Sequence, residues 1–242
     1  DGIYDGTDEI FQKFNTISTT NKASAYLNSK GKVITWGKSD SGGYSHEEFS
    51  LFNSTITNSI STNKRNIKSG VIDIVSTESA FAALKKDGSV VSWGNDNYGA
   101  DQSNKNVELA ADTYKLYSNL YSFCALKRDG TIVTWGDQTK GGDNTYNRSG
   151  GILTNVEKVF SHKNGFIALK KDKTIVTWGN EKSKINHSTY GVNGTLHNNT
   201  TPISILENVL EIYAATSKEI YFAIKTNGNI VKWGESSDSS SY

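Results

Sequence analysis

The side chains best suited to chemistry in this chain are four histidines, one cysteine and 25 acidic residues. His187 and His197 share the polar segment 180–201, but no His-x-His, His-x3-His or Cys-x2-Cys spacing accompanies them, so their pattern does not indicate a metal site. The run His46-Glu47-Glu48 could form a ligand cluster or an acid–base pair, and we interpret it as an exposed loop. No signature of a serine hydrolase, a phosphate-binding loop or a zinc protease occurs. We predict that the chain is not an enzyme and has no catalytic residue, metal ligand or cofactor.

Acidic residues and glycines follow three Trp-Gly pairs, at Asp40, Asp96 and Asp137, and carboxylates next to glycine could bind Ca²⁺. Their oxygen spacing matches no calcium-binding loop. Because the pattern recurs, it also fits a structural role in which Asp and Asn side chains cap turn amides. We favour this structural role.

One 15-residue pattern occurs five times in the chain. The clearest copies are AFAALKKDGSVVSWG at 80–94, SFCALKRDGTIVTWG at 122–136 and GFIALKKDKTIVTWG at 165–179, and weaker copies are ASAYLNSKGKVITWG at 23–37 and IYFAIKTNGNIVKWG at 220–234. The tryptophans are 57, 42, 43 and 55 residues apart, a spacing typical of propeller blades. A unit of this kind must stack against copies of itself to bury its apolar surface.

Each copy contains a hairpin signal, since Asx-Gly pairs such as Asp87-Gly88 lie between two β-prone runs. We expect two-residue type I′ turns, in which both central residues have positive φ. Lys173 takes the place of the glycine in the fourth copy and should carry a backbone penalty if its turn stays left-handed. The alternation before the turn places Ala82 and Leu84 on one face and Phe81 on the other.

A third β-prone run precedes each hairpin, and a polar connector that could hold a fourth strand follows it. These runs are 14–17, 71–75, 114–117, 155–160 and 209–213. No sustained helical periodicity occurs, so the prediction is an all-β protein. The five equivalent tryptophans could line a ligand funnel, but their apolar flanks favour packing between blades. The single cysteine, Cys124, excludes internal disulfides and occupies a position that Ala82 and Ile167 fill elsewhere, which indicates core packing and not a nucleophile.

These residues resemble the repeat of the regulator of chromosome condensation family, A-L-x-x-D-G-x-V-x-x-W-G, followed by a glycine six residues after the tryptophan. That glycine is Gly42, Gly99 or Gly141 in the first three copies, and Lys184 and Ser239 replace it in the last two. The resemblance implies one β-propeller over residues 1–242, with repeats centred on Trp36, Trp93, Trp135, Trp178 and Trp233.

Members of this family act in nucleotide exchange on a small GTPase, in chromatin binding and in β-lactamase inhibition, usually through loops that bind a protein. The Asn-, Ser- and Thr-rich composition is more similar to secreted-type bacterial and protist members. The well-known propellers of the family have seven blades and this chain shows five. Residues 1–13 could supply a strand that closes the ring, which we favour, or the open edges could pair with another subunit.

The overall composition excludes several functional classes. The chain has 26 basic and 25 acidic residues, a net charge of +1, and no basic stripe suited to nucleic acid. No apolar run is long enough to span a membrane. The chain has no methionine and begins at Asp1, which favours a processed, secreted or cell-surface product. N-glycosylation acceptors occur at Asn53, Asn147, Asn186, Asn193, Asn198 and Asn199.

We therefore predict a secreted or surface propeller that acts as a protein-interaction or structural assembly module, by self-assembly or with a protein partner. The alternative is a soluble inhibitor, recognition protein or lectin that binds one protein or glycan through aromatic residues of the connectors. These candidate binding residues are Tyr44, Phe49, Tyr98, Tyr146 and Tyr190.

Overall fold

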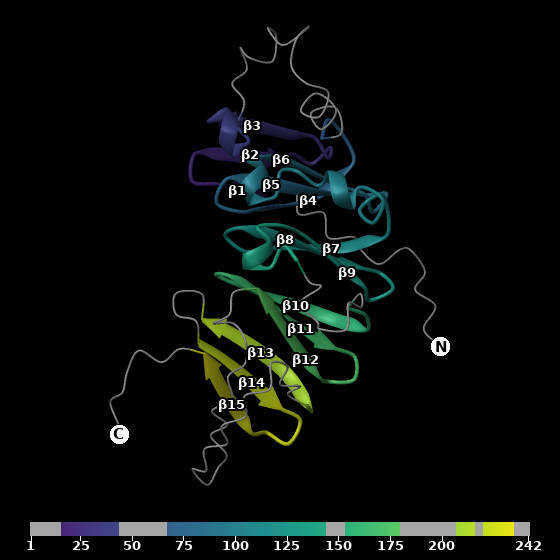
Figure 1. Ribbon diagram of the computed structural model, residues 1–242. Helices are drawn as coiled ribbons and strands as arrows, with labels where there is room; N and C mark the ends of the chain where they lie inside the picture. Colours follow the sequence, from purple (N-terminus) through teal and green to yellow (C-terminus); the bar gives the residue numbers. More distant parts are fainter. Residues whose placement is uncertain (1–15, 44–66, 144–152, 180–206, 216–219, 235–242) are drawn as a thin grey trace, which may run out of the picture.

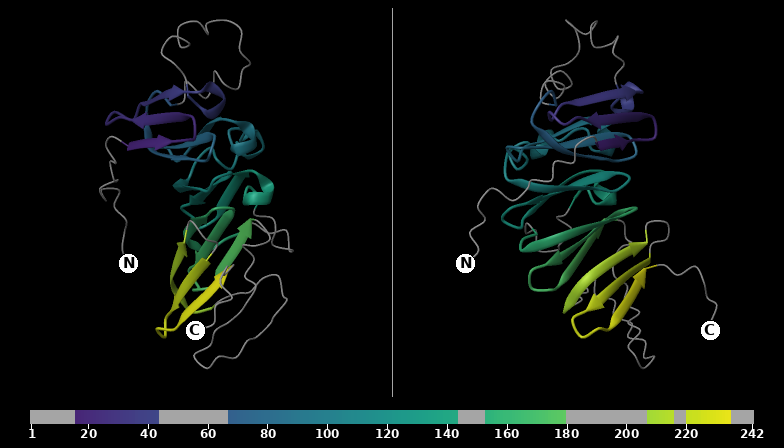
Figure 2. Two further views of the ribbon diagram at one scale, coloured as in Figure 1. Left: turned by 90° about the vertical axis from the view of Figure 1, so that its left-hand side faces the viewer. Right: turned by 180° about the vertical axis from the view of Figure 1, so that it is seen from behind.

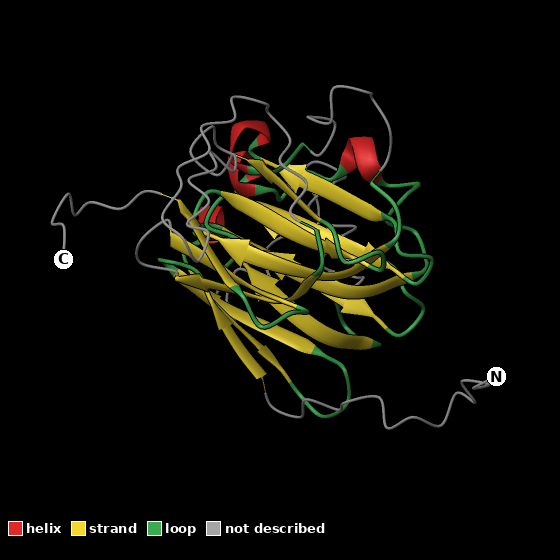
Figure 3. Cartoon of the chain, turned by 90° about the horizontal axis from the view of Figure 1, so that it is seen from below, coloured by secondary structure: helices red, strands yellow, loops and turns green. Residues whose placement is uncertain are grey.

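The computed structural model describes residues 16–43, 67–143, 153–179, 207–215 and 220–234 of the chain. The described residues are almost entirely strands and turns, with a few short 3-10 turns and no α-helix (Figure 3). None of the helical segments in these ranges has the length and apolar character that crossing a membrane requires.

Each repeat forms one antiparallel sheet of three strands, and we call these sheets blades one to five. The blades consist of β1 (Thr16–Thr19), β2 (Ala23–Leu27) and β3 (Val33–Gly37); β4 (Val71–Ser76), β5 (Ala80–Lys85) and β6 (Val90–Gly94); β7 (Thr113–Ser118), β8 (Ser122–Lys127) and β9 (Ile132–Gly136); β10 (Val156–His162), β11 (Gly165–Lys170) and β12 (Ile175–Gly179); and β13 (Val209–Ala215), β14 (Ile220–Lys225) and β15 (Ile230–Gly234). The predicted first strand of every blade is present, although residues 14 and 15 of the first lie outside the described residues.

Short 3-10 turns follow the tryptophan strands of blades one, two and three. They are η1 (Ser39–Ser41), η2 (Asp96–Tyr98) and η4 (Gln138–Lys140). The connector 99–112 of blade two holds a further turn, η3 (Ser103–Lys105), and no fourth strand. The fourth strand that the connectors could hold is therefore not formed in this one, where Gln102 Nε2 and the Leu109 carbonyl instead bond to the backbone of Val90.

The blades follow one another in chain order, from β1–β3 at the top of Figure 1 to β13–β15 at the bottom. The first strands of consecutive blades contact one another, which places these strands where neighbouring blades come closest. Blades one and five lie at opposite ends of this array, also when it is seen from behind (Figure 2). The described blades therefore form an open arc and not the closed five-blade ring that we favoured from the sequence. Residues 1–13, which could close a ring, lie outside the described residues.

The hairpins differ from the predicted type I′ turns. In blade two, Gly88 has a φ of 78° whereas Asp87 does not have a positive φ. The Gly88 amide donates to the Lys85 carbonyl at 2.9 Å, and the Lys85 amide donates to the Ser89 carbonyl at 2.9 Å. This pattern is that of a three-residue loop in which a left-handed residue follows an ordinary turn. The turn of the fourth copy does stay left-handed, since Lys173 has a φ of 66°, and the backbone penalty expected in that case applies to it.

The apolar core is divided into four clusters, one between each pair of consecutive blades. Strand β5 contributes to two of them, with Phe81 and Ala83 packing towards blade one and Ala82 and Leu84 packing towards blade three. The alternation predicted from the sequence is therefore confirmed, and each interior blade is covered on both faces. Each blade has a leading face, which packs on the preceding blade, and a trailing face, which packs on the following blade.

Candidate functional site

The interior tryptophans join consecutive blades. Trp93, Trp135 and Trp178 are 5, 2 and 4 % exposed. Their indole Nε1 atoms donate to carbonyl oxygens in the preceding blade, from Trp93 to Gly42 at 3.2 Å, from Trp135 to Gly99 at 3.0 Å and from Trp178 to Gly141 at 3.1 Å. These three tryptophans are therefore packing residues, as predicted, and do not line a ligand funnel.

The glycine six residues after each of the first three tryptophans allows this contact. A Cβ atom on Gly99 would lie 2.7 Å from the Phe123 ring of the next blade, and one on Gly42 would lie 2.7 Å from the Phe81 ring. Both glycines also have positive φ, at the end of a 3-10 turn. The repeated glycine is thus required because the next blade packs directly on the turn.

Blade one exposes the leading face that the other blades bury. Trp36 is 46 % exposed and Ile17 is 60 % exposed, and Ile34 beside them is also exposed. The residues equivalent to Ile17 in the other blades are Ile74, Leu116, Val159 and Ile212, and all of these are buried. The difference arises because no described blade precedes blade one.

Blade five exposes the opposite, trailing face. Ile230 is 60 % exposed and Phe222 is 37 % exposed, with Tyr213 exposed beside them. Their equivalents in blade two are Val90, Ala82 and Val75, of which the first two are buried and the third packs against the next cluster. The leading face of blade one and the trailing face of blade five are therefore two different apolar surfaces at the two ends of the array.

A third candidate surface lies on the edge formed by the turns that follow the tryptophans. The Tyr98 ring stacks on the Tyr121 ring with centroids 5.9 Å apart, and Lys140 Nζ lies 5.8 Å from the centroid of Tyr121. All three side chains are partly exposed. We call Tyr98, Tyr121 and Lys140 the rim cluster.

Of the five predicted binding residues, only Tyr98 lies in the described part of the chain. It belongs to the rim cluster, and its carbonyl accepts a 3.0 Å hydrogen bond from Thr77 Oγ1. Tyr44, Phe49, Tyr146 and Tyr190 lie outside the described residues, as do the six glycosylation acceptors. Sequence reasoning missed Tyr121 because it considered the long connectors only. A search for non-repeated aromatics in the short turns would have found it.

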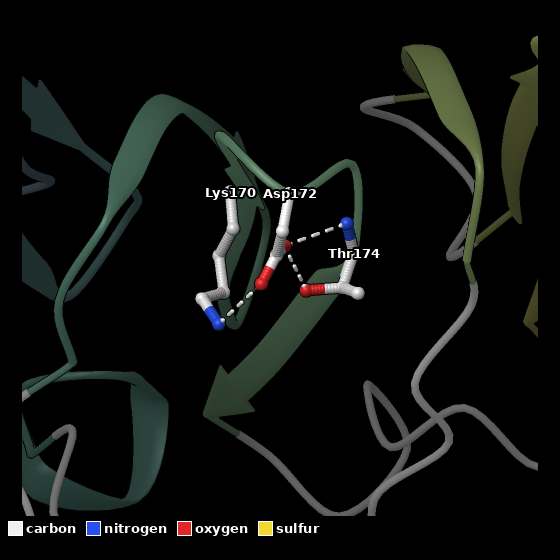
Figure 4. Close-up of polar contacts among 3 residues, drawn as sticks. All are labelled: Lys170, Asp172 and Thr174. Atoms are coloured by element: carbon white, nitrogen blue, oxygen red, sulfur yellow. Dashed lines mark hydrogen bonds and ion pairs between the residues drawn. The ribbon is translucent and has the colours of Figure 1, made fainter.

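The hairpin carboxylates have structural roles. Asp172 Oδ1 accepts hydrogen bonds from the Thr174 hydroxyl at 2.6 Å and the Thr174 amide at 3.0 Å, and Lys170 Nζ lies 3.0 Å from Oδ2 (Figure 4). The Thr174 hydrogen bonds, followed by Lys170, lower the pKa of Asp172 to about 2. Hydrogen bonds from Ser89 likewise lower the pKa of Asp87, and those from Thr131 that of Asp129. Such carboxylates remain ionised and belong to the turns.

The acidic turns after the tryptophans follow the same principle. Asp137 Oδ1 accepts from the Thr139 amide at 2.8 Å, and Asn95 Oδ1 accepts from the Asn97 amide at 3.0 Å. The predicted capping of turn amides is therefore confirmed at these two positions. Over the described ranges, no three His, Cys, Asp or Glu side chains are grouped so that they could hold a metal ion.

Two side chains that could take part in chemistry, Cys124 and His162, are buried. Cys124 is buried, as its core position predicted, and burial raises the pKa of its thiol. His162 packs edge-on against Tyr221 with ring centroids 5.1 Å apart, and burial lowers the pKa of His162 to about 4. Its Nδ1 accepts from the Asn164 amide at 3.4 Å, whereas its buried Nε2 has no partner among the described residues. Neither group is accessible to a substrate.

Several solved structures share this architecture. Prp20p from Saccharomyces cerevisiae, described together with its binding to Gsp1p and histones, matches with a TM-score of 0.54 and 19 % identity over 92 % of this chain and 57 % of Prp20p. Yeast RCC1 (Prp20) bound to Kap60 matches with a TM-score of 0.53 and 17 % identity over 92 % of this chain and 56 % of that one. Human WBSCR16 matches with a TM-score of 0.52 and 14 % identity over 90 % of this chain and 61 % of that one.

These matches identify the fold. The chain is an all-β protein built from blades of the RCC1 propeller type, as predicted. It spans less than two thirds of the length of these three structures. No protein-family model matches the chain, and no curated protein is similar to it in sequence.

Proposed function

We propose that the chain is a protein-interaction or structural assembly module that acts through its propeller loops and edges. The observation that carries this proposal is the pair of uncovered apolar faces on blades one and five, on which Trp36 and Ile230 are exposed. Exposed apolar patches generally mark interaction sites. The fold supports the proposal, since Prp20p was described with its binding to Gsp1p and histones and yeast RCC1 was solved bound to Kap60.

The proposed activity is binding without catalysis. In the described residues the carboxylates of the hairpins hold turns, and the cysteine and His162 are buried. Nucleotide exchange on a small GTPase is an activity of the family that the repeat resembles. Against that activity, no insertion of the sequence stands out as a hairpin that could enter a GTPase.

We further propose a secreted or cell-surface location of the kind found in bacterial and protist members. The Asn-, Ser- and Thr-rich composition and the six glycosylation acceptors support it. Fractionation of the source cells tests it, and recovery of the protein only from the cytosol would contradict it.

The apolar dye anilinonaphthalene sulfonate, together with acrylamide quenching of tryptophan fluorescence, tests whether the end faces are available in solution. We expect the wild-type protein to bind the dye and Trp36 to be quenched more readily than Trp93, Trp135 and Trp178. The double variant Ile34→Lys and Ile230→Lys should lose most of the dye signal, because lysine replaces one apolar residue on each face. Val107→Lys is the matched control, since Val107 is 87 % exposed and belongs to neither face. At a concentration where light scattering shows a monomer, a wild-type protein with no dye binding and no quenched tryptophan would refute the proposal.

A second function, recognition of one protein or glycan, is favoured by the rim cluster. Stacked aromatic rings with an adjacent lysine offer a flat apolar surface and a charged donor, which suits a sugar ring or a peptide aromatic. An oligosaccharide array probed with the wild type and with Tyr121→Ala tests the glycan version. Binding that disappears in Tyr121→Ala and persists in Val107→Lys would establish it, and an array without signal would exclude it.

A further inference from the structure

The four interfaces between consecutive blades have one design. The cluster between blades two and three combines Ala82, Leu84 and Val90 from the trailing face of blade two with Leu116, Phe123 and Trp135 from the leading face of blade three. The other three clusters combine equivalent positions of their own two blades. In all four interfaces, the leading face of one blade is therefore covered by the trailing face of the preceding blade.

In the described part of the chain, one leading face and one trailing face have no such cover. The leading face of blade one displays Ile17, Ile34 and Trp36, and the trailing face of blade five displays Tyr213, Phe222 and Ile230. Inside the array, a trailing face always packs on a leading face, so the two uncovered faces are of the two kinds that pack on each other. None of these six side chains is charged, but a charged residue, Lys232, is in register with Phe222 on the trailing face of blade five, where blades two and three have Ser92 and Thr134.

The sizes of the side chains on the two end faces are complementary. At the position of Phe222, the trailing faces of blades one to four carry Ala25, Ala82, Cys124 and Ile167. The leading-face position that shares a cluster with each of these residues carries Phe81, Phe123, Phe166 and Tyr221, respectively. Blade one has Ser24 at this leading position. In three of the four interfaces a small residue thus shares a cluster with a phenylalanine ring. The end faces have the reverse order, with the large residue Phe222 on the trailing face and the small residue Ser24 on the leading face.

Strand β2 has a large side chain, Tyr26, two residues after Ser24. Blade one has Tyr26 where the other four blades have alanine, at Ala83, Ala125, Ala168 and Ala223. Residues two apart on a strand share a face. On the leading face of blade one, the aromatic side chain therefore stands at position 26 and not at position 24. The small Ser24 leaves room for Phe222, which is larger than its equivalents in the other blades.

We propose that the leading face of blade one binds the trailing face of blade five in a second copy of this chain. This inference rests on the proposed function, because it names the partner that the end faces bind. The contact is head-to-tail, and since blades one and five of one copy lie at opposite ends of the described arc, both faces of each copy can be used at once. Such an interface adds copies one after another.

Two single-face variants test the proposal by light scattering coupled to size-exclusion chromatography over a range of concentrations. Ile34→Lys disables the leading face and leaves the trailing face intact, whereas Ile230→Lys does the reverse. We expect the mass of the wild-type protein to rise above 26.5 kDa with concentration. Each variant alone should remain a monomer, and an equimolar mixture of the two should form a dimer of twice this mass, because one intact leading face then meets one intact trailing face.

The controls separate the possible failures. Val107→Lys should assemble like the wild type, and circular dichroism verifies that each variant is folded. Dimers of Ile230→Lys alone would show head-to-head pairing, and dimers of Ile34→Lys alone would show tail-to-tail pairing. Either result, or a mixture that stays monomeric, overturns the proposal. A monomeric wild type that still binds the apolar dye also overturns it, but leaves the proposed interaction function intact with a different protein as partner.

Discussion

Trp36 and Trp135 occupy equivalent positions in blades one and three, and each is followed by glycine in the last strand of its blade. Trp135 is 2 % exposed and its indole donates to both Ser92 Oγ and the Gly99 carbonyl at 3.0 Å, whereas Trp36 is 46 % exposed. The two residues therefore differ in their neighbours and not in their local structure. A repeated residue is buried only where another blade covers it, and this makes the ends of a repeat array chemically different from its interior.

The hairpins show the same contrast. A Cβ atom on Gly88 in blade two would lie 2.6 Å from the backbone nitrogen of Asp112, in the segment that enters blade three. A Cβ atom on Gly228 in blade five would meet nothing within 4 Å. Both glycines have similar positive φ values, 78° and 83°. The hairpin conformation is thus a property of the repeat, while the tight packing around it depends on the following blade.

Replacing Trp135 and Trp36 separately by alanine gives the largest expected difference. Trp135→Ala should lower the free energy of unfolding by about 3–5 kcal/mol, because it empties a filled interface. Trp36→Ala should cost less than half of that, about 1–2 kcal/mol, because much of the side chain is already in water. Chemical denaturation followed by circular dichroism measures both. Equal losses would show that Trp36 is covered in solution.

The strands could be predicted from the sequence because their signal is local and occurs five times. Alternation in residues such as Phe81, Ala82 and Leu84 specifies which face each side chain occupies, and the structure confirms it. The predicted type I′ turn was wrong because an Asp-Gly pair is compatible with more than one type of hairpin loop. The choice depends on hydrogen bonds such as that from the Gly88 amide to the Lys85 carbonyl, which the residue types do not determine.

The candidate site was less predictable, because exposure depends on the neighbouring blade. Nothing in the local sequence distinguishes Ile34 from its buried equivalent Val133. The rim cluster also forms only in three dimensions, since Tyr98 and Tyr121 come from consecutive blades. Among the predicted binding residues only Tyr98 could be assigned a contact, and the roles of Tyr44, Phe49, Tyr146 and Tyr190 stay predictions.

Gly88→Ala and Gly228→Ala compare an interior hairpin with the terminal one. Both substitutions place a side chain on a left-handed backbone, at a cost of about 1–2 kcal/mol. Gly88→Ala additionally forces the Asp112 backbone to move, so its total cost should be about 2–4 kcal/mol. Denaturation midpoints of the two variants test this difference. If Gly228→Ala were as destabilising as Gly88→Ala, the hairpin of blade five would be covered by another part of the protein.

The interface between blades four and five should depend on pH through His162. Its pKa is about 4 in the folded protein and about 6.5 in an unfolded chain. As the pH falls below 6.5, the unfolded chain takes up a proton that the folded protein does not, so stability is complete above pH 6.5 and is lost between pH 6.5 and 4. At pH 5 the loss should be about 2 kcal/mol.

His162→Asn is the matched control, because blade three has Asn119 at this position. The variant cannot gain a proton there, so its unfolding free energy should fall less between pH 7 and pH 5 than that of the wild type. The hairpin aspartates are the same in both proteins and cancel in the comparison. Identical pH dependence of the two proteins would mean that His162 is not buried as a neutral side chain.

The smallest expected effect concerns Lys173, the only lysine of the described residues with a positive φ. Its carbonyl accepts from the Val209 amide at 2.9 Å, which holds the hairpin of blade four against the start of blade five, and its Nζ lies 2.8 Å from Glu157 Oε2. Lys173→Gly and Lys173→Ala both remove this ion pair, but only glycine accepts the left-handed backbone without penalty. Lys173→Gly should therefore be more stable than Lys173→Ala by about 1 kcal/mol in thermal or chemical denaturation. The opposite order would mean that this hairpin adopts a right-handed backbone in solution, and that the next blade does not hold it in the conformation shared by the other repeats.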